Sequence, residues 1–291
     1  IDVSRDGKWL ASGHAVEPRP DSNGEVVIWN LEQKKEAFRL RGFSQSVHAV
    51  AFSPDGRLLV TGTGDWRMPD REPEAQVWDL TTRRVLFELR GHRGYVGHVA
   101  VSPDGRACAT SSHDGTVKVW DLASGREVFT CPDHKKGAQD VIFSPDNKYL
   151  VTGSGEGEVH FFDVQTGRFV RGVRGHSSYI HRIRFGRNGA RMLTAGGDSS
   201  LKVWQVTSTR GPRSSRPLHG HTNQVYGVAV DRNGRHAISC SGDNTLRLWD
   251  LNTGQQLKQF SCSSEVFNVK YYTDDAVAAC TENGKIFLWR P

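Results

Sequence analysis

Short runs in which apolar and polar residues alternate recur along the whole chain, and each run ends in an aromatic residue. Residues 116–120 have the sequence Thr-Val-Lys-Val-Trp, and residues 245–249 have Thr-Leu-Arg-Leu-Trp. Alternation with a period of two residues predicts a β-strand with one buried face. No segment keeps a helical apolar period over several turns, so the pattern predicts an all-β protein. The closing aromatic residues are Trp29, Trp78, Trp120, Phe162, Trp204, Trp249 and Trp289.

The spacing of these aromatic residues predicts an internal repeat. Successive intervals are 49, 42, 42, 42, 45 and 40 residues. A turn signal recurs with them, as Ser-Pro-Asp-Gly at 53–56 and 102–105 and as Ser-Pro-Asp-Asn at 144–147. Gly and Asn favour tight turns because they tolerate positive φ. A repeat of about 42 residues with four short strands predicts a propeller of radial sheets.

Two dipeptides carry a resemblance to a known family. Trp-Asp at 78–79, 120–121 and 249–250, and Gly-His at 91–92, 175–176 and 220–221, resemble the signatures of WD-repeat proteins. The resemblance covers the whole chain in seven copies, and the repeats are similar to those of bacterial WD-repeat arrays. It implies one domain, 1–291, folded as a seven-bladed β-propeller of four-stranded antiparallel sheets. The expected blades are roughly 1–40, 41–90, 91–131, 132–173, 174–219, 220–260 and 261–291.

The last blade is expected to lack its outer strand. Six fourth strands are predicted, near 36–40, 85–90, 127–131, 168–173, 215–219 and 256–261. In the WD-repeat family the last blade usually borrows its outer strand from residues upstream of the first blade, and residues 1–3 align with the end of an inner strand at 50–52. We therefore expect an exposed edge and a weak ring closure. Because the chain begins with Ile1 and not Met, we also expect it to be a fragment of a longer one.

Four residue types recur together at fixed spacing in three repeats: His precedes Trp by 28 residues, Ser or Thr precedes it by 10, and Asp by 6. The combination resembles a catalytic triad, but an enzyme does not need three equivalent triads. The family resemblance implies instead a buried chain of hydrogen bonds from the Trp N–H through the hydroxyl and His to Asp. We expect no catalytic residue. The three sets are His92, Thr110, Asp114 and Trp120; His176, Thr194, Asp198 and Trp204; and His221, Ser239, Asp243 and Trp249.

The same set is incomplete in other repeats. Phe43 replaces the His of the second repeat, and Glu156 and Phe162 replace Asp and Trp in the fourth, which keeps His134 and Thr152. The seventh has Ala279 and Asn283. We expect these blades to be tied less tightly and to open more readily.

A binding surface is expected on the face that carries the connections between blades and those between the second and third strands of each blade, here called the top face. Two of these connections are seven residues longer than the others, within 13–21 and 65–73. In the family, positions three and five after the repeat His often contact partners. A protein or peptide partner on this face, around the central channel, is our leading hypothesis. The candidate residues are Trp66, Arg67, Met68, Tyr95, Tyr179, His181, Tyr226, His48 and Phe267, with Gln224, Gly97 and Gln139 at related positions.

Charge suggests an alternative function. The chain carries a formal charge of +6, and residues 168–216 hold ten Arg and Lys202 against one acidic residue, Asp198. A basic sector of this kind can attract nucleic acid or another polyanion. A second alternative is a sensor or targeting domain of a larger protein, because some bacterial WD-repeat arrays are fused to protein kinases.

Other classes find no support in the sequence. No apolar run reaches the ~18 residues of a membrane helix, and no secretory signal opens the chain. The five cysteines include no C-x-x-C pair, which favours reduced thiols and a cytoplasmic protein. There is no phosphate-binding loop and no zinc motif, and the twelve His are too scattered for metal ligation. We expect no cofactor, no metal, no membrane partner and a monomeric domain.

Overall fold

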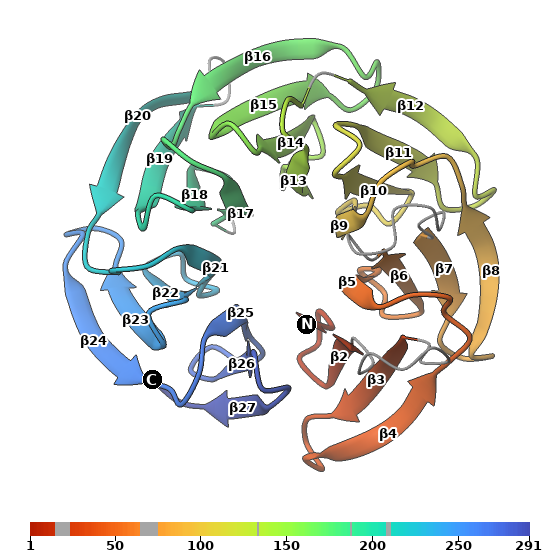
Figure 1. Cartoon of the computed structure of the whole chain (residues 1–291), viewed down its shortest axis with the longest axis horizontal. Coiled ribbons are helices and arrows are strands. Elements are labelled where there is room, and N and C mark those ends of the chain that lie inside the picture. Colours follow the sequence, from red (N-terminus) through yellow and green to blue (C-terminus); the bar gives the residue numbers. More distant parts are fainter. Residues whose placement is uncertain (15–23, 65–74, 133, 187, 208–210) are drawn as a thin grey trace.

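The protein is a ring of small β-sheets. Its computed structural model describes residues 1–14, 24–64, 75–132, 134–186, 188–207 and 211–291. In these ranges the chain forms 27 strands in seven antiparallel sheets, and no helix is present to cross a membrane. Figure 1 shows the sheets arranged like propeller blades around a central axis, which confirms the predicted fold class.

Each blade takes its strands in chain order from the axis outward. Blades 1 to 4 are β1 (Asp2–Val3), β2 (Trp9–His14), β3 (Glu25–Asn30), β4 (Lys35–Leu40); β5 (Val47–Phe52), β6 (Leu58–Thr63), β7 (Ala75–Asp79), β8 (Arg84–Leu89); β9 (Val96–Val101), β10 (Ala107–Ser112), β11 (Val117–Asp121), β12 (Glu127–Cys131); and β13 (Ala138–Phe143), β14 (Tyr149–Ser154), β15 (Glu158–Asp163), β16 (Phe169–Arg174). Blades 5 to 7 are β17 (Ile180–Phe185), β18 (Arg191–Gly196), β19 (Leu201–Thr207), β20 (Gly211–Leu218); β21 (Val225–Val230), β22 (His236–Ser241), β23 (Thr245–Asp250), β24 (Gln256–Ser261); and β25 (Val266–Tyr271), β26 (Val277–Thr281), β27 (Ile286–Trp289).

The recurrent Ser-Pro-Asp turns join the first two strands of a blade. Ser53 Oγ donates a hydrogen bond to Asp55 Oδ1 at 2.5 Å and accepts one from the backbone N–H of Leu58 at 2.8 Å. Gly56 has a φ of 72°, in the left-handed region that favours glycine. The same Ser–Asp hydrogen bond forms at Ser4, Ser102 and Ser144. These turns set the register of the two inner strands and explain why the motif recurs.

The hydrophobic core is divided among the interfaces between neighbouring blades. Between blades 2 and 3, for example, Val77 and Leu89 on one side meet Val99, Cys108 and Trp120 on the other. Five further clusters of the same kind lie between the other consecutive blades from 1 to 7. Three of the five free cysteines, Cys108, Cys131 and Cys240, are buried in these clusters as small apolar residues.

The ring closes between blade 7 and blade 1. Blade 7 has three strands, as predicted, so the outer edge of β27 has no paired strand in the described part of the chain. The buried cluster at this closure has three residues, Leu10, Leu31 and Ala278, whereas the other interfaces have between seven and eleven. Close to the axis, Asp2 Oδ1 lies 2.8 Å from Lys270 Nζ, which adds an ion pair across the closure.

Candidate binding surface at the mouth of the central channel

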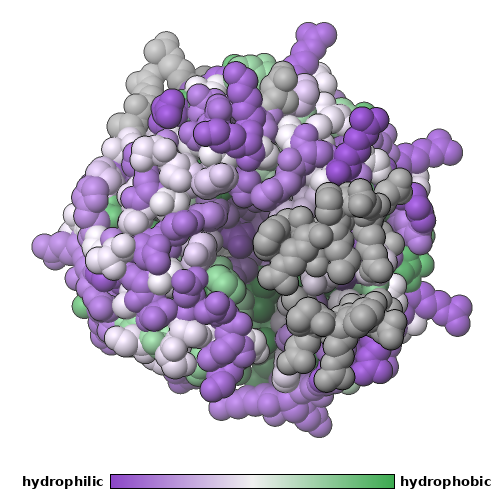
Figure 2. All heavy atoms as spheres, viewed as in Figure 1, coloured by the Kyte–Doolittle hydropathy of each residue, from purple (hydrophilic) through white to green (hydrophobic). Residues whose placement is uncertain are grey.

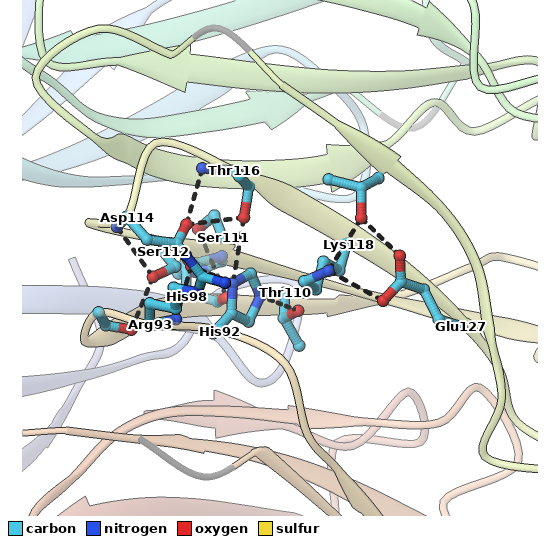
Figure 3. Close-up of polar contacts among 12 residues, drawn as sticks. His92, Arg93, His98, Thr110, Ser111, Ser112, Asp114, Thr116, Lys118 and Glu127 are labelled. Carbon is cyan, nitrogen blue, oxygen red and sulfur yellow. Dashed lines mark hydrogen bonds and ion pairs between the residues drawn. The ribbon is translucent and has the colours of Figure 1, made fainter. Parts of the chain in front are cut away.

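The three complete sets of His, hydroxyl, Asp and Trp form the expected hydrogen-bonded chains. In blade 3, Trp120 Nε1 donates to Thr110 Oγ1 at 2.9 Å, and Thr110 Oγ1 lies 2.7 Å from His92 Nε2. His92 Nδ1 lies 2.9 Å from Asp114 Oδ2, and Figure 3 shows the imidazole between these two partners. A neutral imidazole has one donor and one acceptor nitrogen. Because the Asp114 carboxylate only accepts, Nδ1–H donates to it, and Nε2 accepts from the Thr110 hydroxyl. Blades 5 and 6 repeat the chain with distances of 2.7 to 2.9 Å.

This proton arrangement is the one a Ser–His–Asp triad would have, but access differs. Thr110, Thr194 and Ser239 are fully buried, and an indole N–H occupies each hydroxyl oxygen. A substrate carbonyl has no path to these oxygens. Burial favours a neutral Asp114, but hydrogen bonds from His92 and Thr116 hold its pKa well below the ordinary value. In blades 3, 5 and 6 the chains therefore link the connection before the inner strand to the second strand, the turn after it and the third strand, as satisfied structural networks around an ionised Asp.

The incomplete sets show how other blades compensate. In blade 1, Trp29 Nε1 donates to Ser12 Oγ at 2.8 Å. The same oxygen lies 2.8 Å from Nε2 of His14, which is on the same strand as Ser12. In blade 4, His134 Nε2 lies 2.6 Å from Thr152 Oγ1, and Phe162 stands where the Trp would be. The use of His14 was not expected from the repeat, because this His follows the hydroxyl residue in the chain and does not precede it.

Side chains at the start of the inner strands line a cavity of about 190 Å³ at the top of the channel, here called the channel mouth. Figure 2 shows the ring hollowed at its centre. Four of the expected binding residues meet there, although they come from four different blades: Tyr95, His181, Tyr226 and Phe267. The remaining lining residues are Gly97, His113, Gln139 and Arg182.

Aromatic residues in and beside the channel mouth contact one another in two series. Tyr179, His181, Tyr226 and Phe267 form one series, with ring centroids 6.2, 5.3 and 5.4 Å apart. On the other side, Tyr95 lies between His48 and His113, with centroids 4.7 and 4.9 Å apart. Tyr179 and Phe267 are about 40 % exposed. Such rings contribute large contact area with little loss of conformational entropy when a partner binds.

The other predicted positions are placed differently. Tyr179 borders a second cavity of about 240 Å³ with Lys136 and Arg174, and Gln224 Oε1 accepts a hydrogen bond from His181 Nε2–H at 2.8 Å. His48 bonds the carbonyl of Gly64 at 2.8 Å. Trp66, Arg67 and Met68 lie outside the described residues, and the two longer connections do so for most of their length.

Below the channel mouth lies a buried cluster of charges that the sequence reasoning missed. The carboxylate of Asp140 is fully buried and accepts a hydrogen bond from the backbone N–H of Ile183 at 2.5 Å. His98 Nδ1 lies 2.7 Å from Asp140 Oδ1, and the guanidiniums of Arg182 and Arg184 approach the two oxygens at 3.6 and 3.5 Å. Burial lowers the pKa of His98 to about 4, so its ring is neutral at pH 7.

A register comparison would have revealed this cluster. His98, Asp140 and Arg182 each lie six residues after the repeat position of His92, His134 and His176. Equivalent positions of neighbouring inner strands point toward the same level of the channel, so these three side chains form one layer. Arg184 and Lys270 belong to a second layer two residues further along.

The Arg-rich sector does not form one surface in the described residues. Arg182 and Arg184 face Asp140 in the channel, whereas Arg191 bonds the Asn252 side chain and Arg216 bonds the carbonyl of Leu251. Arg171 packs on the ring of Phe161 at 4.9 Å. Arg187 and Arg210 lie outside the described residues. Within those ranges, no group of three or more His, Cys, Asp or Glu side chains could hold a metal ion.

Comparison with known proteins identifies the repeat. The family model "WD domain, G-beta repeat" matches residues 34–68, 83–121, 125–163, 167–205 and 212–250, together well over half of the chain. Each complete match starts at the outer strand of one blade and continues through three strands of the next, so every repeat joins two blades.

Among the solved structures that match is the β-propeller domain of Myceliophteria thermophila Cps50 (Swd1), with a TM-score of 0.85 and 21 % identity. The alignment covers 100 % of this chain and 96 % of that one, and at this identity it bears on the fold alone. A search of curated protein sequences found no match. The chain belongs to the WD-repeat family.

Proposed function

We propose that this chain is a non-catalytic scaffold that binds a protein segment on its top face, across the channel mouth. WD-repeat propellers are typically protein-interaction scaffolds and are generally not enzymes. The observation that carries the proposal is the series of contacting rings from Tyr179 through His181 and Tyr226 to Phe267 beside an open cavity.

The distribution of exposed apolar side chains supports this location. In the described part of the chain, most large exposed apolar residues lie on outer strands, as Val85, Leu86 and Val128 do, or on the open edge of β27. Tyr179 and Phe267 are the exceptions, since Phe267 lines the channel mouth and Tyr179 stacks on His181, which lines it too. Aromatic residues beside a pocket often contribute most of the binding energy at protein interfaces.

Affinity capture with matched variants tests the proposal. The immobilised protein would capture a partner from a lysate of the source organism, and Tyr179→Ala and Tyr226→Ala would each release the same partner. Leu86→Ala and Leu257→Ala are the controls, because they remove exposed apolar side chains from outer strands. Capture that survives both tyrosine substitutions, or that depends on Leu86, would contradict binding at the channel mouth.

A further inference from the structure

Arg182 stands out among the residues that line the channel mouth because its donors are not used. In the described part of the chain its guanidinium makes no hydrogen bond, and its Nε is buried without a partner. Its only approach to an acid is the 3.6 Å between Nη1 and Asp140 Oδ1, although its side chain is only 13 % exposed. A largely buried guanidinium with unsatisfied donors is unfavourable unless an acceptor is supplied.

Asp140 does not need Arg182 as its partner. One carboxylate oxygen accepts from the Ile183 N–H at 2.5 Å and lies 3.5 Å from Arg184 Nη1. The other oxygen lies 2.7 Å from His98 Nδ1. Asp140 therefore has three contacts besides Arg182, although its Oδ1 makes no hydrogen bond within the described residues, and the guanidinium of Arg182 can bind an additional anion at the cavity wall.

The charge balance favours a single negative charge. Arg182 and Arg184 together exceed Asp140 by one positive charge, and Lys270 is balanced by Asp2 at 2.8 Å. Of the eight residues that line the channel mouth, Arg182 is the one with a permanent charge and none is acidic. Burial lowers the pKa of His113 and of His181 below the ordinary value, so these rings add no charge at pH 7.

Size and shape are compatible with a carboxylate side chain. The cavity volume of about 190 Å³ exceeds the ~150 Å³ of an engineered cavity that holds benzene. The rings of Tyr95, Tyr226 and Phe267 line the cavity together with Arg182. The planar fork of an arginine pairs with a carboxylate through two parallel hydrogen bonds.

We propose that the channel mouth receives the carboxylate of an Asp or Glu side chain of the bound protein segment, with Arg182 as its partner and the surrounding rings as its walls. This inference rests on the proposed function, because it specifies the chemistry of the segment that the top face binds. A basic side chain in the same place would meet the uncompensated charge of Arg182.

The test starts from random dodecapeptides displayed on phage and selected on the immobilised protein, with parallel selections on Arg182→Gln and on Tyr226→Ala. Peptides that require Tyr226 are those that bind at the channel mouth. We expect them to share an Asp or Glu at one position, and we expect this preference to vanish in the Arg182→Gln selection. Melting curves confirm that each variant is folded, and Arg182→Lys is a milder replacement that keeps the charge.

A double-mutant cycle with one selected peptide then isolates the contact. Replacing its acidic residue by Gln, or Arg182 by Gln, should each weaken binding about tenfold, and the two changes together should weaken it no further. Arg41→Gln, at an exposed arginine in the connection between β4 and β5 on the same face, should leave the affinity nearly unchanged.

The outcomes separate the inference from the proposed function. Peptides that need Tyr226 but show no acidic preference would overturn the role of Arg182 and leave the binding surface intact. Tighter binding of a phosphoserine peptide than of the matched Glu peptide would overturn the assignment to a carboxylate. If the selection yields no peptide whose binding depends on Tyr226, both the inference and the proposed function are overturned.

Discussion

The ring of Phe43 packs against the indole of Trp78, with centroids 5.1 Å apart, where blades 3 to 6 place a histidine. As a result Trp78 Nε1 is buried and has no hydrogen-bond partner in the described part of the chain. In blade 3 the equivalent Trp120 Nε1 donates to Thr110. Blade 2 therefore holds its third strand by apolar packing where blade 3 uses packing and a hydrogen bond.

This difference predicts that replacing the Trp by Phe lowers the free energy of unfolding by different amounts in the two blades. Trp78→Phe and Trp120→Phe remove similar buried area, since the two indoles are 5 % and 3 % exposed. Only Trp120→Phe also removes a hydrogen bond, so it should lower the free energy of unfolding by about 0.5–1.5 kcal/mol more. Chemical denaturation of the two variants measures this difference. Equal losses would show that the bond to Thr110 adds no net stability.

His134 predicts a specific loss of stability in acid. The side chain is buried in blade 4, where it lacks the aspartate partner of the complete sets, and burial lowers its pKa from 6.5 to about 4. Between these two values the unfolded chain binds a proton that the folded chain excludes, so stability falls as the pH drops from about 6.5 to about 4. The full effect is up to about 3 kcal/mol.

Denaturation of wild type and His134→Gln at several pH values tests this. The wild type should be the more stable above pH 7, because the variant disturbs the hydrogen bond to Thr152, and its advantage should shrink in acid. Parallel curves for the two proteins from neutral pH to pH 4 would argue against a neutral buried imidazole.

The fold was predictable because its signals recur. Each blade repeats the same alternation, turn and closing aromatic residue, and an accidental match in one unit is corrected by the others. The hydrogen-bonded sets were predictable for the same reason: His176 and His221 stand at the same distance from their Trp as His92 does. In blade 1 the signal failed because His14 reaches the Ser12 hydroxyl from a different position in the chain.

The charge cluster of the channel was harder to predict because its contacts join different repeats. Asp140 and Ile183 are 43 residues apart, about one repeat, and neither is unusual within its own unit. The arginines of the Arg-rich sector are dispersed in the described residues for a related reason. Alternating residues point in opposite directions, so arginines that are close in sequence reach the channel, the outer rim and the turns between strands.

Gly196 predicts that a single methyl group can disrupt a complete hydrogen-bonded set. A Cβ at this position would lie 2.2 Å from His176 Nδ1 and 2.8 Å from Asp198 Oδ1. Gly196→Ala should therefore displace the imidazole and lower the free energy of unfolding by at least about 1–3 kcal/mol. The control is Gly186→Ala in the same blade, where the nearest atom would be 3.7 Å away. Thermal melts in which both variants behave alike would refute the predicted clash.

The closure between blades 7 and 1 should be the first part of the ring to open. Its buried cluster is the smallest, and polar contacts near the axis add the ion pair of Asp2 with Lys270 and a hydrogen bond from Asn268 to the carbonyl of Ile1. Amides of β25 and β26 should exchange with solvent faster than those of β21 and β22, and Asp2→Asn should accelerate them further. Glu88→Gln is the control, because its exposed pair with Arg90 contributes little. Slowest exchange in blade 7 would contradict this account.

The dispersal of the basic sector predicts weak binding of nucleic acid. Arg182 and Arg184 face the channel, and Arg191 and Arg216 are already bonded to blade 6, so few of these side chains can contact phosphates together. Affinity for labelled duplex DNA or RNA should stay within the nonspecific range of about 10⁻⁴–10⁻⁶ M at physiological salt. Each phosphate contact contributes about −0.9 to the slope of log affinity against log salt, so a shallow slope is expected. Submicromolar binding with a steep slope would mean that the basic residues act together, and would favour the polyanion alternative over a protein partner.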